Sequence, residues 1–299
     1  MDPAILQSLL ITGLLRGGLY ALMAAGLALT FGVMNICNFV HGEFYVLGAY
    51  VAYFAFVPFG LNPIVSIALA AAGTFLAGVV IEKTLLWPLR KRSKDEWIMN
   101  TFLLTAGLSV ALQSTYKLLW GVRYKGVTQF WDSRIQVTPD MAVATDRVVA
   151  FAIAIGSIVI FWWFLKQTNL GRAIRAVSQD ERGALLVGIN LDHIHTLAFG
   201  LGCMLAGLGG ASLLSLTPAY PYAGLKPLIR SWFVVTIMGL GSVGGAIVGG
   251  LIVGILESLT FYFLGQGWQD VASLLVLIAL LLIKPSGLFG SEVKGALEK

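Results

Sequence analysis

The sequence predicts an all-α, polytopic membrane protein with about eight or nine transmembrane helices, some of them broken or half-length. Of its 299 residues, 58% are hydrophobic and only 12% are charged, and the mean hydropathy is +0.84. Soluble domains carry about a quarter charged residues, so one core cannot bury this many apolar side chains. Several apolar stretches also reach the roughly 18 to 20 residues that a helix needs to cross a bilayer.

Long apolar runs separated by polar links define the expected helices. The first extends from Pro3 to about Met34, and it is too long and too poor in basic residues at its start for a secretory signal. The other runs cover about residues 43–58, 63–87, 97–120, 147–165, 193–214, 228–240, 246–264 and 269–283. The run at 228–240 would reach only about 20 Å as a helix, so a broken or half-length helix is expected there.

Basic links predict the orientation of the chain. The link at 90–96 (RKRSKDE) holds four basic residues, and the segment 166–192 holds several more. Cytoplasmic loops of membrane proteins are enriched in Lys and Arg, so both segments should face the cytoplasm, and the loop at 121–146 should lie outside. The net charge of +5 then reflects topology and not nucleic-acid binding. Residues 1–299 are expected to form a single transmembrane domain, with 166–192 as its cytoplasmic loop.

Polar residues interrupt the apolar sequence between the first two expected helices. Asn35, Asn38, His41 and Glu43 lie in the stretch NICNFVHGEF, together with Gly42. A polar group in hydrocarbon without a partner costs several kcal/mol, and intramembrane ionisable residues are by default candidates for a functional site. Two roles remain open. The residues can cap backbone groups at a helix break, or they can line the substrate pathway, and the two roles are compatible.

Arg16 is a second charged residue inside an apolar run. A long side chain can extend along its helix until the charge reaches water. Alternatively, Arg16 can form a buried ion pair with Glu43 or with Glu257. The sequence leaves these alternatives open.

Glycines recur at four-residue spacing near the C-terminal end. In GLGSVGGAIVGGLIVG, this spacing relates Gly241, Gly245 and Gly249, and Gly250 and Gly254 repeat it. The spacing places small residues on one face of a helix and lets a second backbone approach closely. Tight helix packing is therefore expected, with gating as a possible additional role.

The sequence lacks the patterns of common enzymes and metal sites. His41 and Glu43 lie two residues apart with no third histidine nearby, so a metal site is not expected. Neither H-E-x-x-H nor G-x-S-x-G occurs, and the G-x-x-x-x-G-K-[ST] phosphate loop is missing. The chain is therefore expected to have no catalytic residues, to bind no cofactor of its own and not to be an enzyme.

The segment 166–192 contains the pattern of a short helix. Ser178 followed by Glu181 matches a capping box, and the helix QDERGALLVG would end at Gly188 in a left-handed conformation. About ten residues form only a marginal helix in water, so the helix should dock onto a cytoplasmic partner or, less well given its length, rest on lipid headgroups. The candidate docking residues are Ser178, Asp180, Glu181, Ala184, Leu185 and Gly188.

Two stretches also carry a family resemblance over nearly the whole chain. They read GLYALMAAGLALTFGVMNICNFVHGEFYVLGAYVAYF and GRAIRAVSQDERGALLVGIN. In both, the chain resembles the smaller membrane-spanning permease subunit of branched-chain amino-acid ABC importers. The family's INFAHGEF-like element stands here as ICNFVHGEF, with Cys37 and Val40 as apolar substitutions, and the second stretch matches the family's coupling helix, with Gly183 where many relatives have alanine.

The resemblance implies a multi-pass permease of the bacterial inner membrane, surrounded by lipid. It implies a second permease subunit, two cytoplasmic ATPase subunits that hydrolyse the ATP, and a periplasmic or lipid-anchored substrate-binding protein. Branched-chain amino acids are the implied cargo, although sister systems carry urea, short amides and carboxylates. The alternative is a stand-alone channel or secondary transporter for a small solute such as urea or amides. That class predicts paired inverted repeats, and no clear internal repeat is visible.

Overall fold

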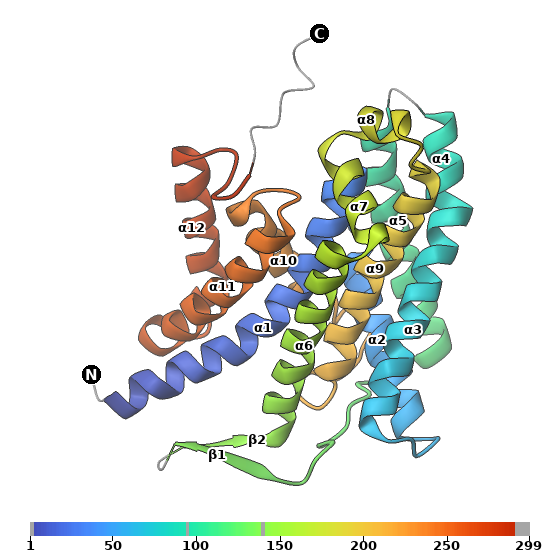
Figure 1. Ribbon diagram of the computed structural model, residues 1–299. Helices are drawn as coiled ribbons and strands as arrows, with labels where there is room; N and C mark the ends of the chain where they lie inside the picture. Colours follow the sequence, from blue (N-terminus) through green and yellow to red (C-terminus); the bar gives the residue numbers. More distant parts are fainter. Residues whose placement is uncertain (1–2, 94–95, 139–140, 291–299) are drawn as a thin grey trace.

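Every apolar run predicted from the sequence forms a helix in the computed structural model (Figure 1), which describes residues 3–93, 96–138 and 141–290. The longer helices are α1 (Pro3–Met34), α3 (Pro63–Ile81), α5 (Trp97–Trp120), α6 (Thr145–Gln167), α9 (Leu191–Ser212) and α11 (Val243–Leu264). The shorter ones are α2 (His41–Phe56), α10 (Leu225–Met238) and α12 (Trp268–Ile283). Among the described residues, five helices, counting α3 with its continuation, are long and apolar enough to cross a membrane. The prediction of a polytopic helical membrane protein is confirmed.

The remaining elements mark the two ends of the bundle. At one end α3 continues through a π-helical turn, η1 (Glu82–Leu86), into α4 (Trp87–Arg92), and α7 (Asn169–Gln179) and α8 (Glu181–Leu186) lie at the same end (Figure 1). Because these elements carry the basic links, we assign this end to the cytoplasmic side by the positive-inside rule, as the sequence predicts. At the opposite end the antiparallel strands β1 (Arg134–Thr138) and β2 (Met141–Ala144) form a hairpin. This hairpin is the local exception to the expected all-helical chain.

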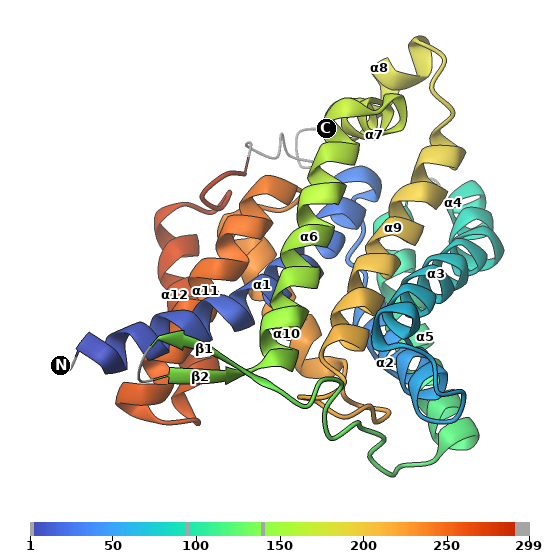
Figure 2. The same ribbon diagram turned by 60° about the horizontal axis from the view of Figure 1, so that its bottom comes forward.

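Helix α1 occupies the centre of the bundle. Figure 2 shows it running obliquely from the N-terminal edge into the middle, where it contacts α6, α9, α10 and α11. Its middle residues, such as Leu22 and Leu27, are fully buried. Helix α9 in turn packs against α2 and α3. The half-length helix expected near 228–240 is α10, whose 14 residues begin at Leu225 and which contacts both α1 and α11.

The three glycines singled out near the C-terminal end do not share one helix face. Ser242 caps α11, since its hydroxyl accepts a hydrogen bond from the N–H of Gly245 at 3.1 Å, so Gly241 precedes the helix. Gly241 lies in the turn with φ of +83°, a conformation that favours glycine. Gly245 and Gly249 both face Met238 of α10. The predicted packing role therefore applies to Gly245 and Gly249, whereas Gly241 forms the turn.

The closest helix contact in this region is made by Gly250 and Gly254, the second pair of glycines at four-residue spacing. A Cβ added at Gly254 would overlap the backbone of Gly17, and one added at Gly250 would overlap the backbone of Ala21. Helices α1 and α11 therefore pack backbone to backbone, as small residues at four-residue spacing allow. This contact fixes α11, which carries Glu257, against the helix that carries Tyr20.

Substituting Gly210 with alanine is expected to destabilise the protein, because a Cβ there would overlap the backbone carbonyl of Tyr45 where α9 packs on α2. Overpacking of this kind costs about 1–3 kcal/mol. The matched control is Gly156→Ala in α6, where a Cβ meets no atom of another element within 4 Å among the described residues. Thermal unfolding of the purified protein should show a lower Tm for Gly210→Ala and an unchanged or slightly higher Tm for Gly156→Ala. Equal shifts in the two variants would contradict this packing.

Candidate functional site

The polar residues near the N-terminus lie at a break between two helices. Helix α1 ends at Met34, and Asn35 follows with φ of +53°, a left-handed conformation that asparagine tolerates better than most residues. The N–H of Asn35 still donates to the carbonyl of Phe31 at 2.8 Å. Residues 36–40 cross to α2, which begins at His41. The structure thus places a break where the sequence predicts one.

Two of these polar side chains hold the start of α2 against its neighbours. Nε2 of His41 donates to the carbonyl of Met23 in α1 at 3.1 Å, and the histidine is fully buried. The carboxylate of Glu43 accepts from Ser109 at 2.9 Å and from Gln113 at 2.8 Å, both in α5. Each bond joins different helices and satisfies one buried polar atom, whereas Nδ1 of His41 and Oε2 of Glu43 have no hydrogen-bond partner among the described residues. Neither residue borders the outer cavity described below.

Asn38 and Gly42 differ from these two residues. The amide of Asn38 is fully buried, and neither of its polar atoms has a hydrogen-bond partner among the described residues. Gly42 provides room for a close chain contact, because a Cβ there would lie 2.6 Å from the carbonyl oxygen of Gly224, the residue before α10. The break is therefore packed against the outer loop that leads into α10.

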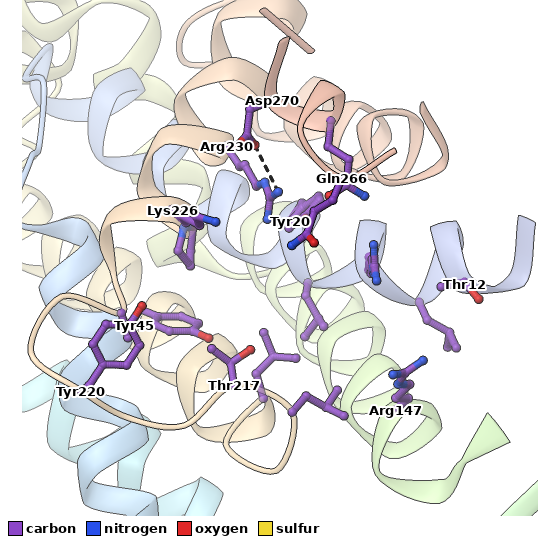
Figure 3. Close-up of a pocket in the computed structure, with 18 residues that line it drawn as sticks. Thr12, Tyr20, Tyr45, Arg147, Thr217, Tyr220, Lys226, Arg230, Gln266 and Asp270 are labelled. Carbon is purple, nitrogen blue, oxygen red and sulfur yellow. Dashed lines mark hydrogen bonds and ion pairs between the residues drawn. The ribbon is translucent and has the colours of Figure 1, made fainter. Parts of the chain in front are cut away.

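A cavity of about 400 Å³ lies beside the first turn of α6, which follows β2 at the hairpin end of the bundle, and Figure 3 shows the side chains that line it. Helices α1, α6, α10 and α12 and the loop between α9 and α10 contribute to its walls. Four basic residues line it, namely Arg16, Arg147, Lys226 and Arg230. Asp270 is the acidic residue among the lining residues. We refer to this space as the outer cavity.

A buried ion pair anchors one wall of the outer cavity. Nε of Arg230 lies 2.9 Å from a carboxylate oxygen of Glu257, whose side chain is only 1% exposed. The other carboxylate oxygen accepts from the hydroxyl of Tyr20 at 2.8 Å. Arg230 also contacts Asp270 at 3.2 Å, the interaction drawn as a dashed line in Figure 3. The network joins α1, α10, α11 and α12, and it fixes the position of Arg230.

The ion pairs considered for Arg16 are not formed. Glu257 is paired with Arg230, and Glu43 accepts its bonds from α5. In the part of the chain that the structure describes, Arg16 has no acidic partner within 4 Å. Its side chain is exposed and lines the outer cavity instead. The sequence reasoning missed Arg230, although a single arginine within the apolar run LIRSWFVVTIM was the available signal.

The cytoplasmic segment differs from its predicted capping pattern. Ser178 belongs to α7, where its hydroxyl donates to the carbonyl of Arg175 at 2.9 Å. The cap of α8 is Asp180, whose carboxylate accepts from the N–H of Arg182 at 3.0 Å. Asp180 has extended backbone dihedrals between two helices, so it alone is placed to cap. The predicted cap at Ser178 is therefore wrong.

Helix α8 has only six residues and ends in an exposed apolar tip. Gly188 adopts a left-handed φ of +83°, and the N–H of Ile189 donates to the carbonyl of Ala184 at 3.0 Å, which closes the helix in a Schellman motif. Ala184 is buried, so it does not belong to the exposed surface that the sequence suggested. Leu185, Leu186 and Val187 are all exposed. We call these three residues the α8 tip.

A second polar network, centred on the buried Glu82, connects the start of α9 to the end of α3. The carboxylate of Glu82, in the π-helical turn, is fully buried and contacts Arg90 at 3.3 Å. Arg90 also lies 2.8 Å from Asp192, in the first turn of α9. The hydroxyl of Thr196 donates to Glu82 at 2.5 Å. The start of α9, which directly follows α8, is thereby joined to the cytoplasmic end of α3.

Comparisons with known proteins agree with this architecture. The family model described as branched-chain amino acid transport system / permease component matches residues 9–283. The permease protein LivH of the high-affinity branched-chain amino acid transport system of Escherichia coli is 28% identical, over 93% of each chain. BraD of Pseudomonas aeruginosa, named in the same way, is 27% identical over 94% of each chain. The fructose import permease FrcC of Rhizobium meliloti is 25% identical, over 92% of this chain and 75% of its own. The chain therefore belongs to the family of permease components of branched-chain amino acid transport systems and is a multi-pass protein of the inner membrane.

Proposed function

We propose that this chain is the membrane-spanning subunit through which an ABC importer carries branched-chain amino acids into the cell. The observation that carries the proposal is the family match over residues 9–283, together with relatives that are named for this transport and align along nearly the whole chain. The complex would contain a second permease subunit and two ATPase subunits, with cargo delivered by a substrate-binding protein. ATP would be hydrolysed by the ATPases, and this chain would bind no cofactor.

The α8 tip supports an ATPase partner. Its three apolar side chains lie at the cytoplasmic end, away from the bundle core. Exposed apolar groups that stand on a rigidly capped helix suit a groove on another protein. The Glu82 network then connects the start of α9, the helix that follows α8 in the chain, to the end of α3. Under this proposal, α8 transmits closure of the ATPases to the membrane helices.

Co-purification of the tagged chain is the direct test of the assembly. We expect to recover one second permease and two ATPase subunits, counted by native mass spectrometry. In vesicles that also receive the binding protein, uptake of L-leucine, L-isoleucine or L-valine should depend on ATP. Because a fructose permease is among the relatives, D-fructose is the control cargo and should not be imported. A lone homo-oligomer with full uptake activity would contradict the proposal and favour a stand-alone transporter.

A further inference from the structure

The outer cavity carries an excess of positive charge. It is lined by four basic residues and by one acidic residue, Asp270. Arg230 is compensated by Glu257 and Asp270, whereas Arg16, Arg147 and Lys226 form no ion pair within 4 Å among the residues that the structure describes. A cleft lined by one sign of charge between low-dielectric walls concentrates the field and attracts ions of the opposite sign.

The location of this charge is unusual for a membrane protein. The cavity lies at the hairpin end, opposite the basic cytoplasmic links, and Figure 3 places Arg147 at the start of α6 and Lys226 on α10. The topological bias concentrates Lys and Arg on the cytoplasmic side, so it does not explain these outer residues. Like charges around one space repel each other unless an anion enters. Their presence therefore indicates an anionic ligand.

The remaining walls of the cavity suit a ligand that has an apolar part as well as a negative charge. Leu15, Leu19, Leu213 and Leu216 line the same cavity as the basic residues. Its volume of about 400 Å³ falls within the range of roughly 300–1,000 Å³ that is usual for small-molecule sites. Guanidinium groups bind carboxylates through paired hydrogen bonds. A small carboxylate with an aliphatic side chain satisfies both the charged wall and the apolar wall.

We infer that the outer cavity binds a small aliphatic carboxylate, with Arg16 as a principal contact to the carboxylate group. The identity of the ligand rests on the function proposed above: it is the branched-chain amino acid. The cavity receives the carboxylate of this amino acid when the binding protein releases it. Arg230, held by Glu257 and Tyr20, provides a fixed positive charge beside the site. Arg16 has no such partner in the described residues and remains available to the ligand.

A thiol-protection assay on the assembled complex tests this inference. Thr217, which lines the cavity, is changed to cysteine after the native Cys37 and Cys203 are replaced by alanine. The rate of labelling by a maleimide is then measured with excess L-leucine, 4-methylpentanoate or L-leucinamide. We expect both carboxylates to protect the thiol, and we expect L-leucinamide, which lacks a carboxylate, not to protect it.

The arginine variants add the decisive comparison. Arg16→Gln should raise the carboxylate concentration needed for half-protection by about tenfold, as expected for losing a charge-assisted hydrogen bond. Arg16→Lys keeps the positive charge and should show a smaller increase in this concentration. The matched control is Arg123→Gln. Arg123 is an exposed residue of the outer loop and is not among the residues that line the cavity. It should leave protection unchanged. Unchanged protection in Arg16→Gln, or equal protection by L-leucinamide, would overturn the inference.

Three further outcomes distinguish this inference from related ideas. If Arg16→Gln weakens association of the binding protein but leaves protection by L-leucine intact, the basic residues serve as a docking surface for an acidic protein segment, and the inference is overturned. If wild-type vesicles import no branched-chain amino acid but 4-methylpentanoate still protects Thr217→Cys, the proposed cargo is wrong and the carboxylate site stands. Intact leucine import without protection by either carboxylate would overturn the site alone.

Discussion

Changing Leu186 to aspartate should abolish ATP-driven uptake and leave the membrane bundle folded. Leu186 is 89% exposed at the centre of the α8 tip, so removing its side chain disturbs little packing within this chain. In an ATPase groove the same side chain would be buried, and a carboxylate there would lose its hydration. Hot-spot residues of this kind contribute about 2 kcal/mol or more to binding, which corresponds to at least roughly 30-fold weaker association of the ATPases.

The measurements for this variant are ATPase co-purification, L-leucine uptake and the Tm of the permease. The matched control is Leu118→Asp, because Leu118 is 86% exposed but lies at the outer end of α5. It should retain its ATPases. If Leu186→Asp lowered the Tm of the isolated permease, the residue would have a structural role instead. If the ATPases remained bound at the wild-type level, α8 would rest on lipid headgroups, the alternative that the sequence left open.

The helices could be predicted because their signals are local. Length and hydropathy of each run suffice to identify a membrane helix, and even the half-length α10 follows from a short apolar run before a glycine-rich turn. Its start at Leu225 was missed by three residues, because Pro227 lies in the first helical turn, where its missing N–H has no intrahelical partner to lose.

The sites were less predictable because they depend on which helices become neighbours. Arg230 and Glu257 lie 27 positions apart on α10 and α11, and Glu257 had been considered as a partner of Arg16. Only the packing of α1 and α10 on α11 shows that Tyr20 and Arg230 reach the carboxylate first. The capping box at Ser178 failed for a different reason. The pattern is short, and α7 continues through it to Gln179 before the chain turns.

Replacing Arg230 with methionine should produce the largest loss of stability. The substitution keeps an apolar stem of similar length but leaves the carboxylate of Glu257 buried without its cation. Breaking a buried ion pair from one side costs about 3–5 kcal/mol. At about 2–4 °C per kcal/mol for large domains, the Tm should fall by about 10 °C in a thermal unfolding experiment. The control is Asp270→Asn, which removes the partner that is 61% exposed and should change stability by less than about 1 kcal/mol.

The double variant Arg230→Met with Glu257→Gln identifies the source of this cost. A neutral glutamine removes the buried charge, and its amide oxygen can still accept the hydrogen bond from Tyr20. If the destabilisation comes from an uncompensated carboxylate, the double variant should recover most of the lost Tm, since replacing both members of a buried pair is often nearly neutral. If the single and double variants melt together, the contacts of the arginine stem matter more than its charge. Arg230 has two roles: its ion pair holds four helices together, and its positive charge lies beside the outer cavity. If the double variant recovers the Tm but L-leucine still fails to protect Thr217→Cys from labelling, these two roles are separate.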